Sequence, residues 1–433
     1  MAGYNCLLSR SSVSQFQTDQ RIKLPFFLFF FFRKYQDIPD GRLRMRNRQQ
    51  TLERYCSTQR NEDLDSPDDS GGEPLFRSNS LVSRQRRLLY CPVGKAASTL
   101  LTRFLVSALE TDPVVSPYAI SIQKALRMRE KRSGNGVLFK PLNKLAAATG
   151  GQEKRFLESL TRVLFVRCPF RRLWSAYVDK LVLPNPNYWQ AWGRPAMNGS
   201  QARSAAADGD GDDDGESQRV WPGEAEPAEA AREECGQSVT FSQFLRFVLS
   251  DLHLRDAHVR PVARECAPCY VNYDVIGHVE TLASDVLHLT RLLRWNDSAL
   301  RTVRWREERA TDAIKDGVRN VFDKWRPLIT RCMSMEEAGR RLWRVSQIRG
   351  VIGEREQYPF AGRGARPLAA AAVERALLEA RSRSRGQGEE LARQENSAFR
   401  AAYGAIGAEL KKAIRKVYRA DFHMFGFDVL LHL

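Results

Sequence analysis

Residues 88–110 read LLYCPVGKAASTLLTRFLVSALE and decide the fold. The apolar run LLYCPV (88–93) is typical of a buried strand, and apolar side chains then recur at helical spacing over residues 96–110. A second strand and helix are predicted from VLFV (163–166) and PFRRLWSAYVDKL (169–181). Strand, short loop and helix, repeated, predict an α/β fold with a central parallel sheet flanked by helices.

The composition limits the class of protein and of partner. The chain has 433 residues, of which 43% are hydrophobic and 10% aromatic, and this excludes a fully disordered protein. Lys and Arg number 68 against 51 Asp and Glu, a net charge of +17. Such a basic balance favours acidic partners: nucleic acid, anionic lipid, phosphate-bearing ligands or acidic polysaccharides.

The N-terminal part has the composition of a tail. Its apolar run LPFFLFFFF (24–32) has nine residues, too few for a helix across a membrane, which needs about 20. Flanking basic residues leave two interpretations, the remnant of a type II signal anchor or a chance apolar patch. Residues 35–80 are polar and predict a solvated linker or stalk.

The remainder, residues 81–433, is expected to be one domain with two extra segments. Residues 196–234 contain the acidic low-complexity stretch DGDGDDDGES and predict a disordered surface loop. Residues 300–400 are rich in Arg and Ala, and this insertion is expected to be helical or partly disordered, with no evident chemistry. A helix is also expected over residues 238–252, and another towards the C-terminus over 410–430.

The loop CPVGKAAST (91–99) has the chemistry of an anion site. Lys95 leaves the end of a strand, and Ser98 and Thr99 begin a helix whose N–H groups attract anions. The loop is not a Walker A motif, because Ala96 stands where Ser or Thr would hold magnesium. Taken alone, the loop is better explained as an ordinary strand-to-helix turn with a surface lysine.

A second loop, FVRCPFRRLWSAYVDK (165–180), brings three arginines to the end of a strand. Arg167, Arg171 and Arg172 offer forked donors suited to a phosphate, or they form a solvated helix face. Two further blocks are HVRPVARECAPCYVNYDVIGHVETL (258–282) and YRADFHMFGF (418–427).

Together the four blocks resemble Golgi carbohydrate sulfotransferases, the family that acts on chondroitin, dermatan, terminal N-acetylgalactosamine or glucuronic acid. Lys95, Thr99 and Arg103 match its first motif for 3′-phosphoadenosine 5′-phosphosulfate (PAPS), and residues 165–180 match nearly all of its second. The resemblance implies a P-loop-like sulfotransferase fold and transfer of a sulfuryl group to a glycan hydroxyl.

The resemblance also implies roles for individual residues. Lys95 and Thr99 would hold the 5′-phosphosulfate, and Arg167 and Ser175 the 3′-phosphate. Lys95 would stabilise the leaving phosphate. His258 is the first choice of base, with His278 and Glu280 as alternatives, and Asp274 could simply anchor a strand end. The full set expected at the donor site is Lys95, Ala97, Ser98, Thr99, Arg103, Arg167 and Ser175, with no metal.

The cysteines and glycosylation signals bear on the compartment. Cys266 and Cys269 form CxxC, which is half a zinc site, so a disulfide is favoured, local or with another cysteine such as Cys235. Asn198 and Asn296 begin glycosylation sequons. The resemblance implies a single-pass type II protein of the Golgi membrane with its catalytic domain in the lumen.

Several positions depart from the family pattern and leave the acceptor open. They are Gly94 for a proline, Cys168 for an acid, Leu100 and Leu101 for an Asn-Trp-like pair, and Val259 for a tryptophan. The favoured acceptor is an acidic glycan of the chondroitin or dermatan class, and nucleic acid is not expected because the basic residues are dispersed. The alternatives are a catalytically inactive glycan-binding relative and a nucleotide kinase.

Overall fold

A five-stranded sheet forms the centre of the described chain, which in this computed structural model comprises residues 41–58, 74–110, 115–125, 132–133, 136–137, 139–146, 152–199, 235–362 and 367–430. The strand order is β5 (Lys140–Pro141), β1 (Leu81–Ser83), β2 (Leu88–Cys91), β6 (Thr161–Val166) and β7 (Val275–His278). Strands β2, β6 and β7 run parallel, which confirms the predicted parallel sheet, whereas β1 is antiparallel to both β2 and β5.

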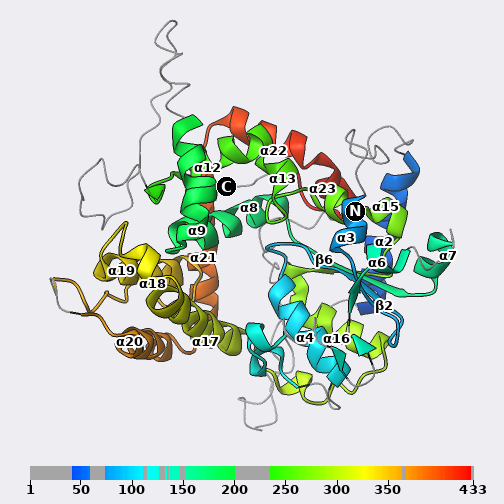
Figure 1. Cartoon of the computed structure of the whole chain (residues 1–433), viewed down its shortest axis with the longest axis horizontal. Coiled ribbons are helices and arrows are strands. Elements are labelled where there is room, and N and C mark those ends of the chain that lie inside the picture. The colour runs from blue at the N-terminus through cyan, green and yellow to red at the C-terminus, as the bar shows by residue number, and fades with distance from the viewer. Residues whose placement is uncertain are drawn as a thin grey trace, which may run out of the picture.

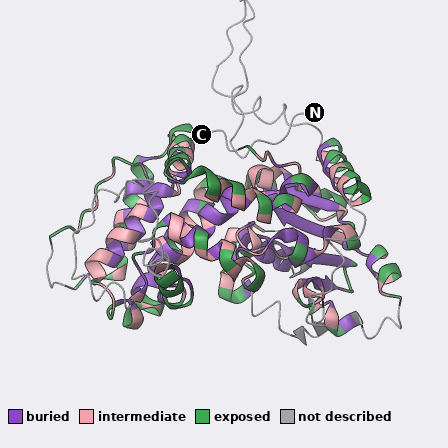
Figure 2. Ribbon diagram, turned by 90° about the horizontal axis from the view of Figure 1, so that it is seen from above, coloured by how far each residue is buried: buried purple, intermediate pink, exposed green. Residues whose placement is uncertain are grey.

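Helices cover both faces of this sheet, and the alternation of strand residues decides which face each side chain meets. Leu88 and Tyr90 of β2 lie in one apolar cluster with side chains of α4 (Ser98–Glu110) and α16 (Leu282–Leu292). Leu89 of β2 lies in the larger cluster on the other face. Figure 1 shows α4 and α16 together beside the sheet, and Figure 2 shows the strands almost entirely buried.

The remaining elements of the described residues are mostly short. They are α3 (Leu75–Asn79), η1 (Pro117–Ala119), β3 (Arg132–Ser133), β4 (Gly136–Val137), α6 (Asn143–Ala146), α7 (Glu153–Glu158), α9 (Pro186–Tyr188), η4 (Trp189–Gly193), α12 (Phe241–Phe247), η5 (Val248–Leu252), α13 (His253–Arg255), α14 (Val262–Cys266), α15 (Pro268–Val271), η6 (Val279–Thr281), η7 (Leu300–Thr302), η8 (Arg319–Lys324), α18 (Arg326–Ile329), α22 (Ala408–Val417) and α23 (Arg419–Met424).

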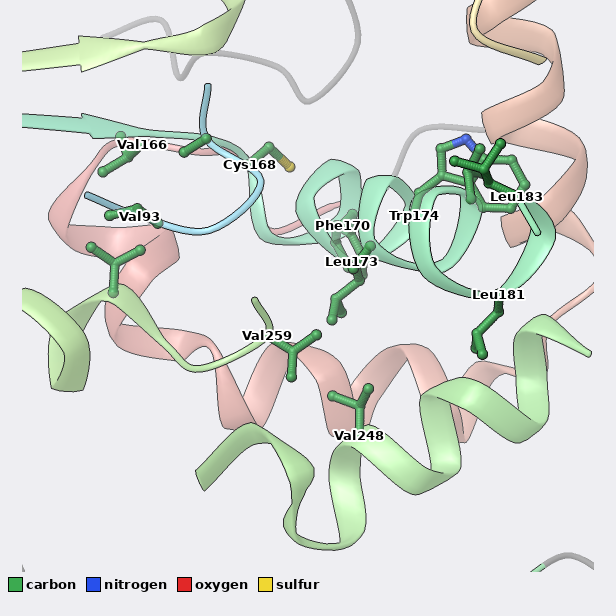
Figure 3. Close-up of a cluster of buried hydrophobic side chains, with 14 of the residues drawn as sticks. Val93, Val166, Cys168, Phe170, Leu173, Trp174, Leu181, Leu183, Val248 and Val259 are labelled. Atoms are coloured by element: carbon green, nitrogen blue, oxygen red, sulfur yellow. The ribbon is translucent and has the colours of Figure 1, made fainter. Parts of the chain in front are cut away.

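Helix α8 (Pro169–Tyr177) lies at the centre of the larger cluster and continues as a π-helical turn, η3 (Val178–Val182). Pro169 at its first turn suits a helix start because its missing N–H has no acceptor there. In Figure 3, Phe170 and Leu173 of α8 lie near Val259, which follows the candidate base in the chain. The predicted strand and helix of this unit are confirmed.

Residues 300–400 belong to the same core and are not a loosely attached insertion. They contain α17 (Trp305–Val318), α19 (Met335–Ile348), α20 (Ala370–Arg383) and α21 (Gly388–Gly404). Buried side chains of all four helices join the cluster that contains α8. Of the two expectations for this segment, helical or partly disordered, the helical one is confirmed for its described part.

The N-terminal helix α2 (Gly41–Thr58) corrects the expected solvated stalk. Arg44 and Arg48 are about 3% exposed and bind opposite oxygens of the buried Asp285 carboxylate, each at 2.8 Å. A disulfide joins Cys56 at the end of the helix to Cys269. One face of this polar segment is therefore buried against the domain, while Arg42, Arg46, Glu53 and Arg54 remain exposed.

Three disulfide bonds join described cysteines: Cys56–Cys269, Cys91–Cys266 and Cys235–Cys332. The expectation that Cys266 and Cys269 form disulfides is confirmed, each with another cysteine, whereas neither the local bond nor a bond to Cys235 is present. Ala267 takes a left-handed conformation (φ 42°) between α14 and α15, and the two flanking sulfurs reach different elements, β2 and α2. CxxC spacing alone carries no information on such distant partners.

Two sequence features fall outside the described residues: the apolar run 24–32 and residues 200–234 of the acidic loop. Within the described ranges, none of the helices combines the length and the apolar character needed to cross a bilayer.

We expect Asp285→Ala to lower the free energy of unfolding by about 3–5 kcal/mol, because it leaves two arginines buried without their carboxylate. The Asp285 carboxylate also accepts from the Thr281 hydroxyl at 2.6 Å and the His278 N–H at 3.0 Å. Urea unfolding under non-reducing conditions measures the loss.

Asp297→Ala is the control, because its partners Arg291 and Arg301 are largely exposed and such pairs contribute about 1 kcal/mol or less. Equal losses would contradict the assignment.

Candidate active site

The loop between β2 and α4 has the backbone geometry of an anion-binding turn. Lys95 and Ala97 both have positive φ angles, 64° and 62°, which residues with a Cβ seldom adopt. Alternating right- and left-handed residues turn successive N–H groups towards one point. The first intrahelical bond of α4 runs from the Leu101 N–H to the Ala97 carbonyl, so the N–H groups of Ser98 and Thr99 precede the helical ladder. Ser98 is half-buried and Thr99 exposed.

The Lys95 ammonium forms an ion pair with Asp179 of η3. The same carboxylate meets Lys180 at 3.3 Å and Arg349 at 3.0 Å. Burial lowers the pKa of Lys95 to about 8, although Asp179 opposes that shift. Burial alone would raise the pKa of Asp179, but Lys95, Arg349 and Lys180 together hold it well below its usual range.

Arg167, which follows β6, and Glu280, which follows β7, carry buried polar atoms without partners in the described part of the chain. These atoms are Nε of Arg167 and both carboxylate oxygens of Glu280. Burial lowers the pKa of Arg167, while Glu280 and Glu395 act in the opposite direction. A buried polar atom without a hydrogen-bond partner destabilises the fold, so such atoms after the carboxyl ends of β6 and β7 indicate a place for a polar ligand or water.

Arg103 and Arg171 contact the helices of residues 300–400. Arg103 is 1% exposed and binds Asp312 at 2.7 Å and Asp316 at 3.3 Å, both on α17. Arg171 donates to the Asn396 side chain at 2.7 Å and lies 4.5 Å from the ring centre of Phe399. These contacts connect α4 and α8 to α17 and α21, and the role of Arg103 in donor binding stays a prediction.

Arg172 joins the Lys95 loop to the loop that carries His258. Its guanidinium donates to the carbonyl oxygens of Gly94 at 2.8 Å, Arg260 at 2.5 Å and Ala257 at 3.0 Å. A Cβ on Gly94 would lie 2.7 Å from the Ala257 oxygen and 2.8 Å from His258 Cα. Glycine at position 94 therefore permits close contact between the two loops.

Asp256 orients the His258 ring. Its Oδ1 lies 2.9 Å from Nδ1 and also accepts the His258 backbone N–H at 2.8 Å. A carboxylate at Nδ1 favours the tautomer whose Nε2 carries a lone pair. Trp192 Nε1 donates to the other Asp256 oxygen at 3.2 Å, and the Tyr188 ring lies edge-on at 5.6 Å.

The His258 side chain is 32% exposed, so a substrate can reach it. Burial lowers its pKa, as do Lys180 and Lys95, while the bond to Asp256 opposes them. His258 is therefore neutral near neutral pH and can accept a proton. Because Lys95 affects the pKa of His258, the predicted base and the lysine predicted to bind the sulfate donor lie within electrostatic range of each other.

The alternative base His278 lies in the core. It is 1% exposed, and its ring centre is 4.7 Å from that of Phe427. Asp274 accepts from the Arg162 backbone at 2.7 Å and from its guanidinium, which confirms the expectation that it anchors a strand end. Glu280 lies within electrostatic range of Arg167.

A sequence model described as the sulfotransferase family matches residues 78–335, more than half of the chain. The chain belongs to this sulfotransferase family. The matched range contains both anion loops, His258 and Glu280. Arg349, Glu395 and Asn396 lie beyond its end.

Curated relatives agree with this assignment. The chain is 26% identical to human carbohydrate sulfotransferase 8 over 51% of this chain and 44% of that protein. It is 26% identical to mouse carbohydrate sulfotransferase 12, covering 58% and 57%, and 25% identical to human carbohydrate sulfotransferase 9, covering 50% and 41%. The chain thus spans about half the length of the curated relatives it matches. No solved structure matches.

In this sulfotransferase-family chain, two of the predicted donor residues, Lys95 and Arg167, and the alternative base Glu280 follow strands of the central sheet. Lys95, Arg167 and Glu280 follow the carboxyl ends of β2, β6 and β7, and Ser175 lies two turns into α8, half-buried and without a side-chain partner among the described residues. Within the described ranges, no cluster of three or more His, Cys, Asp or Glu side chains could hold a metal ion.

Three neighbours of the predicted residues were not foreseen: Asp179, Asp256 and Arg349. Asp256 could have been found from its D-x-H spacing, which lets a carboxylate bond to both the backbone and the ring of His258. Asp179 lies inside the second motif, but nothing there shows that it pairs with Lys95. Arg349 has no sequence signal, because its approach depends on the packing of α19.

Proposed function

We propose that this chain transfers a sulfuryl group from PAPS to a hydroxyl of an acidic glycan, with a chondroitin- or dermatan-like acceptor favoured. One observation carries the proposal: the anion loop of Lys95 packs directly against the loop of the Asp256–His258 pair. A donor site and a base are thereby adjacent, as transfer between two bound substrates requires.

The residues present fit the donor. The N–H groups and Lys95 at the start of α4 suit a phosphosulfate, and the unpartnered Nε of Arg167 suits a phosphate oxygen. Ser98, Thr99 and Ser175 would add hydroxyl donors. When bound, PAPS supplies the sulfuryl group: the acceptor oxygen bonds to sulfur while the bond from sulfur to the 5′-phosphate oxygen breaks. Adenosine 3′,5′-bisphosphate then leaves.

The chain's own contribution is positioning and charge. Lys95, at the turn into α4, would lie beside the leaving phosphate, and its ammonium would stabilise the negative charge that develops there. His258 Nε2 would take the proton of the acceptor hydroxyl, and Asp256 would stabilise the resulting imidazolium. The net charge of +17 suits a polyanionic acceptor.

Further features support a secretory route and the Golgi lumen. Three disulfides join described cysteines, and such bonds persist in oxidising compartments. Both sequon asparagines, Asn198 and Asn296, are exposed, as glycosylation requires. The relatives' names identify them as carbohydrate sulfotransferases. A type II membrane anchor remains part of this proposal.

Transfer of labelled sulfate from PAPS to a panel of acceptors tests the proposal. The panel contains desulfated chondroitin, desulfated dermatan and a glycan ending in N-acetylgalactosamine. We expect transfer to at least one acidic acceptor. Donor binding without any transfer would favour a glycan-binding relative that has lost catalysis. Magnesium-dependent ATP turnover without PAPS binding would contradict the proposal and favour a nucleotide kinase.

A further inference from the structure

Arg349 reaches the donor loop from a part of the chain that lies beyond the family match. It is the C-cap of α19, and the next residue, Gly350, has φ 60°. The Gly350 N–H binds the Gln347 carbonyl at 2.9 Å, and the Val351 N–H binds the Ser346 carbonyl at 2.8 Å. This is a Schellman ending, which fixes the backbone direction at Arg349.

The glycine is also required by packing. A Cβ on Gly350 would lie 2.5 Å from the Leu391 carbonyl oxygen of α21. Helix α19 itself contributes buried Leu342, Trp343 and Val345 to the core. The position of Arg349 is therefore set by the fold and not by a mobile surface loop.

Arg349 and Lys95 bind the two oxygens of one carboxylate. Arg349 Nη2 lies 3.0 Å from Asp179 Oδ1, and the Lys95 ammonium binds Asp179 Oδ2. Lys180 lies 3.3 Å from the same Oδ2. Three cations thus surround one carboxylate, which leaves an excess of positive charge at a partly buried position.

This excess has a consequence for ligand binding. Like charges disfavour each other in a poorly solvated site unless an anion joins them. Arg349 lowers the pKa of both Lys95 and Arg167, although burial is the larger cause in each case. It therefore lies within electrostatic range of both predicted phosphate-binding residues.

We propose that Arg349 is a donor-binding residue, whose guanidinium holds the phosphosulfate of PAPS together with the Lys95 ammonium. In the absence of the donor, the Asp179 carboxylate pairs with both cations. This inference rests on the proposed function. A forked guanidinium suits two oxygens of a phosphate or sulfonate better than an ammonium does. The helical layer of residues 300–400 then completes the donor site.

Titration calorimetry with adenosine 3′,5′-bisphosphate tests the assignment on the full chain, together with steady-state kinetics against PAPS. The variants are Arg349→Ala, Arg349→Lys and Asp179→Asn, and thermal unfolding verifies that each one folds. Arg383→Ala is the matched control, because Arg383 lies in the same segment and pairs with Glu356 on the surface at 2.6 Å.

We expect Arg349→Ala to weaken binding of the bisphosphate about 10- to 100-fold and to raise the KM for PAPS similarly. Arg349→Lys should recover part of the loss, and Arg383→Ala should bind as the wild type does. Unchanged affinity in Arg349→Ala, with a wild type that binds, would overturn the assignment alone. Equal losses of bisphosphate affinity in Arg349→Ala and Asp179→Asn would also overturn the assignment. Arg349 would then affect binding only by keeping Asp179 in position, without contacting the donor. A wild type that binds no bisphosphate would overturn the proposed function first.

Discussion

Lys95→Ala should lower the rate of sulfate transfer about 100- to 1,000-fold. This is the range seen when one preorganised hydrogen-bond donor to a developing negative charge is removed. Lys95 is the cation at the turn into α4, and only 14% of its side chain is exposed. Water therefore cannot replace the ammonium well, because the site is poorly solvated. Both kcat and donor affinity should fall, since the ammonium contacts the donor before and during transfer.

Lys154→Ala is the control for this variant, because Lys154 is an exposed lysine on α7, outside the donor loop. Initial rates at saturating acceptor measure the effect. A Lys95→Ala enzyme that retains more than about a tenth of the wild-type rate would contradict the assigned role. Substitution should also free Asp179 from one of its partners while Lys180 and Arg349 remain.

His258→Ala should lower kcat about 100- to 10,000-fold and leave the affinity for adenosine 3′,5′-bisphosphate unchanged. The reason is that His258 would act on the acceptor hydroxyl and not on the donor. His253→Ala is the control, because the His253 ring bonds to the Val248 carbonyl of its own helical segment at 2.8 Å. If His258→Ala kept the full rate of transfer, another residue would have to act as the base, and Glu280 would be the next one to test.

The pH profile separates the two roles. Burial lowers the pKa of His258, so kcat/KM should rise as pH rises through a midpoint below the ordinary histidine value, where the neutral base forms. The pKa of Lys95 is about 8, so kcat/KM for PAPS should fall as pH rises through that value, where the ammonium loses its proton. His258→Ala should abolish the acidic limb and keep the alkaline one.

The sequence was most informative where local pattern and local structure coincide. The strands at residues 88–91 and 161–166, and the helices that follow them, form where apolar periodicity predicts them. Lys95 and Arg167 follow the neighbouring parallel strands β2 and β6, whose carboxyl ends share one edge of the sheet. His258 reaches the Lys95 loop through a contact with Gly94 that no strand pattern predicts. The order of β1 and β5, antiparallel at the outer edge, has no comparable local signal.

Errors came from residues whose partners are distant in sequence. The polar helix α2 has the composition of a stalk, yet its Arg44 and Arg48 are buried and pair with Asp285, more than 230 positions away. The sequence suggests that Arg172 could donate hydrogen bonds to a phosphate, but its guanidinium donates to three backbone carbonyls. Such assignments depend on tertiary contacts, which residue type and spacing do not specify.

A crystal structure with adenosine 3′,5′-bisphosphate would test most directly that the edge formed by β2, β6 and β7 is the donor site. We expect the 5′-phosphate at the start of α4 beside Lys95, the 3′-phosphate against Arg167 and Ser175, and Arg349 released from Asp179. Binding at another place on the chain, or no binding at concentrations that saturate the wild type in solution, would contradict the assignment.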